Sequence, residues 1–179
     1  MRRIRMAVLG LALGSFAAPA LCAQAQPTEG TRFGLGIGVT MPMGDYGTAD
    51  KNGYHLLGVL QMPIGGSPVH LRFDAMYSQT SHDGATGSTS LLGGTVDALY
   101  HLGDRSSSAR PYILGGLGFY NADFGGGSSE SKLAYGFGGG VLFGISGLHA
   151  FAEARYMSVQ TSGSSLNFVP ITIGLMFGS

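Results

Sequence analysis

Charged side chains are scarce in this chain of 179 residues: they make up 11% of it, against about 25% in a typical soluble protein. Tryptophan is absent, and cysteine occurs only once, at Cys22. No run of about 20 apolar residues follows the first two dozen positions, which excludes a transmembrane helix there. No basic patch is present either, so we expect no nucleic-acid partner.

The N-terminal segment has the pattern of a secretion signal. Arg2, Arg3 and Arg5 precede an apolar stretch, and Ala23-Gln24-Ala25 supplies a cleavage site. We therefore predict a signal peptide over residues 1–25 and one mature domain over residues 26–179. Cleavage there removes Cys22 and leaves seven basic and ten acidic residues, a net charge of −3. Leu21, before Cys22, argues against a lipoprotein anchor.

Alternation of apolar and small or polar residues dominates the mature sequence, and a period of two predicts β-strands. The final strand shows it most clearly, since Val169, Ile171, Ile173, Leu175 and Phe177 form an unbroken apolar row. Segments of about ten residues match the length of a tilted strand that crosses a bilayer. Eight are predicted: 32–41, 54–63, 69–79, 91–102, 111–120, 132–145, 149–159 and 166–177.

The connections between these strands are predicted to alternate in length. Links at 65–68, 103–110 and 146–148 are short, and links at 42–53, 80–90, 121–131 and 161–165 are longer and polar. Short periplasmic turns and longer external loops are typical of outer-membrane barrels. With an even number of strands, both termini return to the periplasm, and the eighth strand must pair with the first.

The less apolar face argues for a lumen and against a water-exposed surface, which a soluble barrel would show. It consists mainly of Gly, Ser and Thr, with near pairs of opposite charge and Asp97 on the fourth strand. These pairs are Arg72 with Asp74 and Glu153 with Arg155, which can neutralise one another in a narrow lumen. Tyrosines near strand ends are predicted to form the interface girdles of a membrane barrel: Tyr54, Tyr77, Tyr100, Tyr112, Tyr120, Tyr135 and Tyr156.

The mature chain resembles the small eight-stranded outer-membrane barrels of the OmpX and OmpA-barrel type. The resemblance is carried by four stretches: Phe33-Gly34-Leu35-Gly36-Ile37-Gly38, Pro111-Tyr112-Ile113-Leu114-Gly115-Gly116-Leu117-Gly118, Glu153-Ala154-Arg155-Tyr156 and Ile171-Thr172-Ile173-Gly174-Leu175-Met176-Phe177. It implies that the last strand, with its terminal aromatic, is the signal read by the barrel-assembly machinery. In this chain Gly178 and Ser179 follow that aromatic.

Three kinds of chemistry compete with a purely structural reading. His70, His101 and His149 share the parity of the lumen charges near the periplasmic strand ends, so a three-histidine metal site is chemically possible. Lipid A deacylases of this shape place His and Ser two residues apart on a strand, and no histidine here has that partner. The lumen charges could gate a narrow pore, although eight strands are just wide enough to be filled by side chains.

We therefore predict an all-β protein, an eight-stranded antiparallel up-and-down barrel in the outer membrane of a Gram-negative bacterium. No catalytic residue, cofactor or metal ligand is assigned. The glycines are interpreted as room for bulky lumen neighbours and not as a nucleotide-binding loop. Outer-membrane lipid is the expected surrounding, and the barrel is expected to be monomeric. We expect a structural or surface-interaction role without catalysis, in which the external loops meet a host surface, a partner or the environment. A lipid-modifying enzyme or a narrow pore is the alternative.

Overall fold

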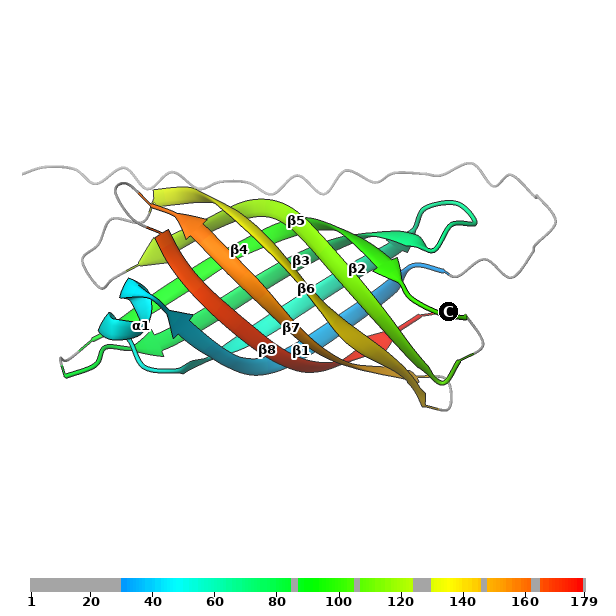
Figure 1. Ribbon diagram of the computed structural model, residues 1–179, viewed down its shortest axis with the longest axis horizontal. Coiled ribbons are helices and arrows are strands. Elements are labelled where there is room, and N and C mark those ends of the chain that lie inside the picture. Colours follow the sequence, from blue (N-terminus) through cyan, green and yellow to red (C-terminus); the bar gives the residue numbers. More distant parts are fainter. Residues whose placement is uncertain are drawn as a thin grey trace, which may run out of the picture.

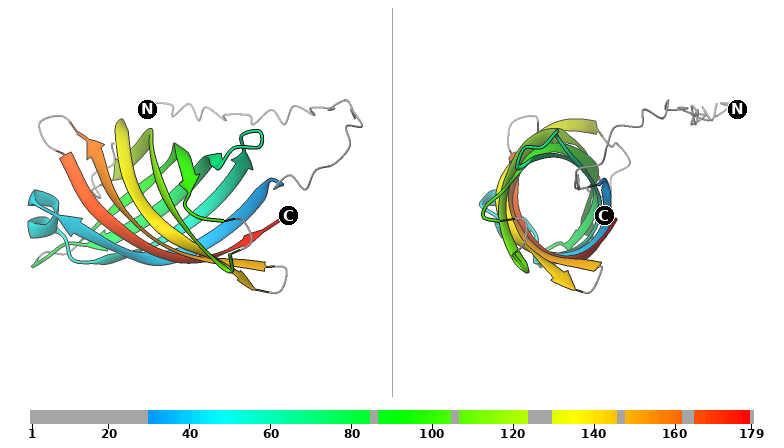
Figure 2. Two further views of the ribbon diagram at one scale, coloured as in Figure 1. Left: turned by 45° about the vertical axis from the view of Figure 1, so that its right-hand side comes forward. Right: turned by 90° about the vertical axis from the view of Figure 1, so that its right-hand side faces the viewer.

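Eight antiparallel strands close into one barrel in sequence order, with β8 returning to pair with β1 (Figure 1). The computed structural model describes residues 30–84, 87–104, 107–123, 130–145, 148–161 and 165–178. Seen along its axis, the wall is a continuous ring (Figure 2). The predicted fold class is therefore confirmed, while the signal peptide predicted at residues 1–25 lies outside the described residues.

The strands match the predicted segments and extend several of them by a few residues. One short helix, α1 (Asp45–Ala49), interrupts the β1–β2 connection. No helix among the described residues is long and apolar enough to cross a membrane. The strands are β1 (Arg32–Met43), β2 (Gly53–Pro63), β3 (Val69–Ser81), β4 (Ser88–His101), β5 (Ala109–Asp123), β6 (Glu130–Ile145), β7 (Leu148–Gln160) and β8 (Ser165–Phe177).

The barrel closes between its first and last strands, as the sequence predicted. Phe33 faces Phe177 in register, and Thr40 faces Pro170. The start of β1 and the end of β8 therefore meet at one end of the barrel, which we call the terminal end. Helix α1 lies at the opposite end, which we call the loop end (Figure 1).

The two faces of the wall differ sharply. Odd positions of β1 and β8 point outward, and their large apolar side chains stay exposed, with Leu35 at 69% and Ile173 at 61%. The apolar row predicted for the last strand faces outward, and the charged pairs of the third and seventh strands face the lumen, as predicted. On β2 and β5, the buried residues His55 and Tyr112 mark the faces that point inward. A continuous apolar outer wall is suited to lipid and not to water.

Two of the seven predicted girdle tyrosines are not on the outer face. Tyr112 and Tyr120 point into the lumen and are 3% and 2% exposed. Near the loop end, the outward tyrosines include Tyr54 and Tyr135, which are 52% and 41% exposed. The prediction was wrong for Tyr112 and Tyr120 because β5 is apolar on both faces, so the alternation does not show which face is inside.

The predicted contrast in loop length is weaker in the structure. The strands continue into the predicted external loops, so β3 and β4 are separated by residues 82–87, while β4 and β5 are separated by residues 102–108. The β1–β2 connection, residues 44–52, is longer than either of these. The extension is favourable because each added residue pairs its backbone groups across the ladder.

Glycines make room in the lumen for bulky side chains of neighbouring strands. A Cβ added at Gly140 would lie 2.6 Å from the Tyr112 hydroxyl, and one at Gly116 would lie 2.5 Å from an Asp97 oxygen. At Gly38 it would lie 2.6 Å from the His55 ring. A small residue opposite a large one lets side chains fill a narrow barrel without strain.

Replacing an inward glycine should therefore be far more damaging than replacing an outward one. We expect Gly140→Val to lower the free energy of unfolding by at least about 3 kcal/mol, the upper range for overpacking. The matched control is Gly58→Val, since a Cβ at Gly58 meets nothing closer than an Ala75 oxygen at 3.8 Å. Urea titration in detergent micelles measures both, and equal losses would contradict this role of the inward glycines.

Candidate functional site

The centre of the lumen holds a network of five charged side chains that joins opposite walls of the barrel. Arg72 of β3 donates to Glu153 of β7 through Nη1 at 2.6 Å and Nη2 at 3.3 Å. Arg155 of β7 donates from Nη2 to Asp74 of β3 and from Nη1 to Asp97 of β4 at 3.3 Å. Since β3 and β7 are four strands apart around the ring, these ion pairs span the lumen.

Neighbours on the same strand complete the pairing that the sequence predicted. Arg72 Nε donates to Asp74 Oδ1 at 2.8 Å, and Arg155 Nε donates to Glu153 Oε1 at 2.5 Å. Tyr112 adds a hydrogen bond to Glu153 Oε2 at 2.7 Å. Glu153 therefore accepts from two guanidinium groups and a phenol, which is the surrounding that a buried carboxylate needs.

Asp97 is the least satisfied carboxylate of this network. Its Oδ2 accepts from Thr95 Oγ1 at 2.5 Å and from Arg155. Its Oδ1 is buried with no hydrogen-bond partner among the described residues. With two arginines and three carboxylates, the network carries one more acid than base, and Asp97 is the carboxylate that keeps one oxygen without a donor among the described residues.

The network also blocks the lumen. Arg72 and Asp97 are 2% and 1% exposed, and the Arg72 guanidinium lies 5.7 Å from the centre of the Phe151 ring. The cavity beside the network, lined by Asp74, Glu153 and Arg155, measures about 10 Å³. That is room for about one water molecule.

A layer of neutral polar groups lies between the charge network and the loop end. The His55 ring on β2 lies within hydrogen-bond distance of Thr40 Oγ1 through Nδ1 (3.1 Å) and of Thr172 Oγ1 through Nε2 (2.9 Å). Ser78 continues this layer, with its Oγ 2.8 Å from Thr40 Oγ1. These residues come from four adjacent strands, so the layer ties β8, β1, β2 and β3 together.

At the loop end, Tyr46 of α1 inserts into the lumen and is 4% exposed. Thr80 Oγ1 donates to Asp50 Oδ2, so the Tyr46 hydroxyl donates to Thr80 at 2.8 Å. The Tyr46 ring packs edge-on against Phe168, with centroids 6.4 Å apart. Burial raises the pKa of Tyr46 to about 12, so it remains a neutral donor. These contacts of Tyr46 were not predicted, because α1 is too short to show a helical period.

One group at the loop end resembles a catalytic triad in composition but not in geometry. His82 Nε2 is 3.8 Å from Asp50 Oδ1 and 3.3 Å from Thr89 Oγ1. A relay needs the acid on one ring nitrogen and the nucleophile on the other. Because both neighbours meet the same nitrogen, this arrangement cannot pass a proton from threonine to histidine while aspartate orients the ring.

Of the three histidines considered for a metal site, two lie together where the sequence predicted them. His70 and His101 point into the lumen near the terminal end, and their rings meet edge-on with centroids 4.8 Å apart. Gln61 Nε2 lies 3.2 Å from His101 Nε2. His149 is on β7, across the barrel from β3. Among the described residues, no group of three His, Cys, Asp or Glu side chains has the arrangement of a metal site.

Arg110, expected in the short link before the fifth strand, belongs to β5 and points inward at 6% exposure. The link ends earlier than predicted because β5 begins at Ala109 and Arg110 pairs in the ladder with Leu142. Arg110 is therefore a lumen residue and not part of an exposed link.

Removing Arg155 should strongly destabilise the barrel, because it leaves Asp74, Asp97 and Glu153 short of positive charge in a dry lumen. We expect Arg155→Leu to lower the free energy of unfolding by about 3 to 5 kcal/mol, the usual cost of breaking a buried ion pair from one side. The control is Lys51→Ala. Lys51 is exposed and pairs with Asp83 at 3.0 Å, so its loss should cost less than about 1 kcal/mol. Comparable losses in urea titration would show that the network does not stabilise the fold.

Solved structures with the same architecture come from outer membranes. The Neisserial surface protein A superposes with a TM-score of 0.66 at 17% identity, over 83% of this chain and 97% of that one. Ail, the attachment invasion locus protein of Yersinia pestis, gives 0.56 at 16% identity, over 84% and 100%. The N-terminal barrel of Pseudomonas aeruginosa OprF gives 0.51 at 18% identity, over 83% and 98%.

These likenesses show a shared fold. A comparison with curated proteins found no match. A family model, in contrast, covers almost the whole sequence: the outer membrane protein beta-barrel domain matches residues 8–178. The apolar outer wall, the plugged lumen and this match lead to one conclusion, that the chain belongs to the outer membrane protein beta-barrel family and resides in the bacterial outer membrane.

Proposed function

We propose that this protein is a closed, non-catalytic scaffold that holds its loop end at the cell surface for contact with a partner. The observation that best supports this proposal is the charge network, which fills the lumen instead of leaving a channel. In the orientation predicted from the sequence, the terminal end faces the periplasm and the loop end faces the outside.

The lumen is obstructed at successive levels. The charge network fills the middle, the His55 layer lies between it and the loop end, and Tyr46 is buried in the lumen at the loop end. A permeating solute would have to separate paired charges in a low-dielectric interior, which is costly. This supports a scaffold and disfavours the narrow pore considered from the sequence.

The loop end also offers a fixed surface. Asp50 and His82 form a β-bridge between the first two loop-end connections, and the Lys51 and Asp83 backbones donate to Ser81 and to Ala49. A surface held this way loses less conformational entropy on binding than a mobile loop would. We infer that these two bridged connections, which include Asp45, Asp50, Lys51, His82 and Asp83, form the contact region.

Catalysis is not supported by the described geometry. His82 cannot relay a proton between Thr89 and Asp50, since both meet its Nε2. His55 is 1% exposed and its hydroxyl neighbours are buried with it. An enzyme that modifies lipids needs its nucleophile within reach of the substrate, and neither histidine offers one.

The charge of the contact region favours a basic partner. Asp45 and Asp83 are exposed there beside a single exposed lysine among the described residues, Lys51. Ail has been solved in complex with the heparin analogue sucrose octasulfate. An acidic contact region would repel such a polyanion, so the partner of this chain should differ in charge.

The purified barrel should be electrically silent in a planar bilayer. We expect no steady ohmic conductance after insertion, because the lumen has room for about one water beside the charge network. Protease protection of the inserted protein in vesicles serves as the control for insertion. Reproducible steady openings would contradict the closed scaffold and favour the pore.

Heparin should not retain the wild-type protein at physiological ionic strength, because the exposed carboxylates of the contact region oppose a polyanion. The comparison variant is Asp45→Lys with Asp83→Lys, which reverses the local charge and should increase retention on a heparin column. Retention of the wild type, or no change in the double variant, would show that the contact region does not set the charge preference.

A further inference from the structure

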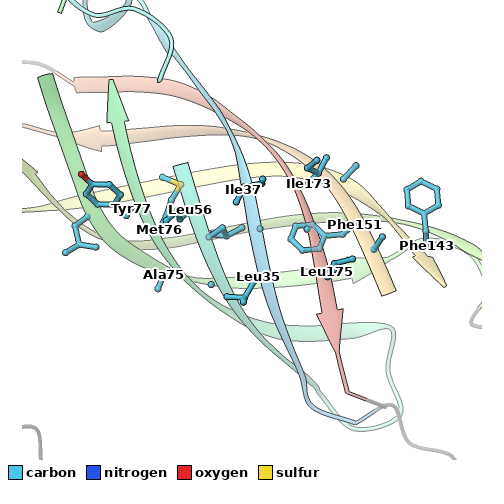
Figure 3. A pocket seen from close by; sticks show the side chains of 17 residues that line it. Leu35, Ile37, Leu56, Ala75, Met76, Tyr77, Phe143, Phe151, Ile173 and Leu175 are labelled. Carbon is cyan, nitrogen blue, oxygen red and sulfur yellow. The ribbon is translucent and has the colours of Figure 1, made fainter. Parts of the chain in front are cut away.

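The outer wall of the barrel carries an apolar groove of about 940 Å³ on the side where β7, β8, β1, β2 and β3 meet (Figure 3). Two parallel rows of outward side chains flank it, and each row follows residues that pair in register across these strands. The first row runs through Ala150, Leu175, Leu35, Gly58 and Ala75. The second runs through Ala152, Ile173, Ile37, Leu56 and Tyr77.

Small residues explain why the wall is hollowed here. The residues between the two rows, among them the paired Gly36 and Gly174, point into the lumen, so only their backbone faces the groove. In the first row, Gly58, Ala75 and Ala150 leave gaps beside the larger Leu35 and Leu175. The lining is apolar throughout, apart from the Tyr77 hydroxyl.

The shape of the groove fits a hydrocarbon chain. The two rows are two residues apart along each strand, or about 7 Å. An α-helix about 10 Å wide would rest on the flanking rows without entering, and a second barrel wall would pack at a similar distance. A single acyl chain is thin enough to reach the backbone between the rows.

A polar cluster lies near the groove on the same outer face, toward the loop end. The Tyr54 and Tyr77 hydroxyls both donate to Gln79 Oε1, at 2.7 and 3.4 Å, and Gln79 Nε2 donates to Ser88 Oγ at 3.2 Å. Tyr77 belongs both to this cluster and to the groove. Such amphipathic groups lie at the level of lipid headgroups.

We propose that the groove binds one acyl chain of a lipid from the outer leaflet, with the lipid headgroup beside the cluster of Tyr54, Tyr77 and Gln79. This is a defined site on the wall and not the general contact that every barrel makes with its bilayer. This lipid site is independent of the surface role proposed above, because it lies on the apolar outer wall and not at the loop end.

Native mass spectrometry of protein extracted from outer membranes in mild detergent tests this site. The wild type should retain one lipid per barrel. Gly58→Phe, which places a ring in the groove, should reduce the lipid-bound fraction about tenfold, the effect of losing roughly two buried methylene contacts. A Cβ at Gly58 meets only an Ala75 oxygen at 3.8 Å, so the barrel should still fold.

Gly115→Phe is the matched control, because Gly115 is also on the outer face but outside the groove. A Cβ there meets Gly136 O at 3.5 Å and Phe137 Cβ at 3.6 Å, both ordinary contacts. This variant should keep the lipid. A bare wild-type barrel, equal loss in both variants, a retained dimer or a retained lipid of the periplasmic leaflet would each overturn the proposal. Mobility shift on heating verifies that both variants are folded.

Discussion

The pairing of five charges inside a narrow lumen is the constraint on which the rest of this structure depends. Arg72 and Arg155 cannot remain ionised in a dry interior unless carboxylates surround them. Those carboxylates come from opposite walls, since Glu153 lies on β7 and Asp74 on β3. The network therefore holds together strands that no backbone ladder joins, and the diameter of the barrel must match the reach of the arginines.

The glycine pattern follows from that constraint. A lumen that holds side chains as large as those of Arg72, Arg155, Tyr112 and Phe151 has no room for side chains on every neighbouring strand. Gly140 lies under Tyr112, Gly116 under Asp97 and Gly174 under Phe151. On the outer face, the small residues Gly58 and Ala75 leave a groove in the wall.

Sequence reasoning recovered the strands, their order and most faces, because a period of two is local and lipid demands an apolar outer row. It found two pairs of neighbours, Arg72 with Asp74 on one strand and Glu153 with Arg155 on another. It could not show that Arg72 reaches Glu153, because contacts across a lumen depend on register. Tyr112 and Tyr120 were misplaced because β5 is apolar on both faces. The contacts of α1 and the bridge of Asp50 to His82 were not predicted, because they lie in short polar segments that show no period.

A double-mutant cycle between Arg72 and Glu153 tests the central claim most directly. Both residues are replaced by methionine, singly and together, and the unfolding free energy of each barrel is measured in the same detergent. If the network holds opposite walls together, the coupling energy should reach at least about 1.5 kcal/mol, within the range for directly contacting groups. Additive losses, with coupling near zero, would show that the two walls are held by their ladders alone.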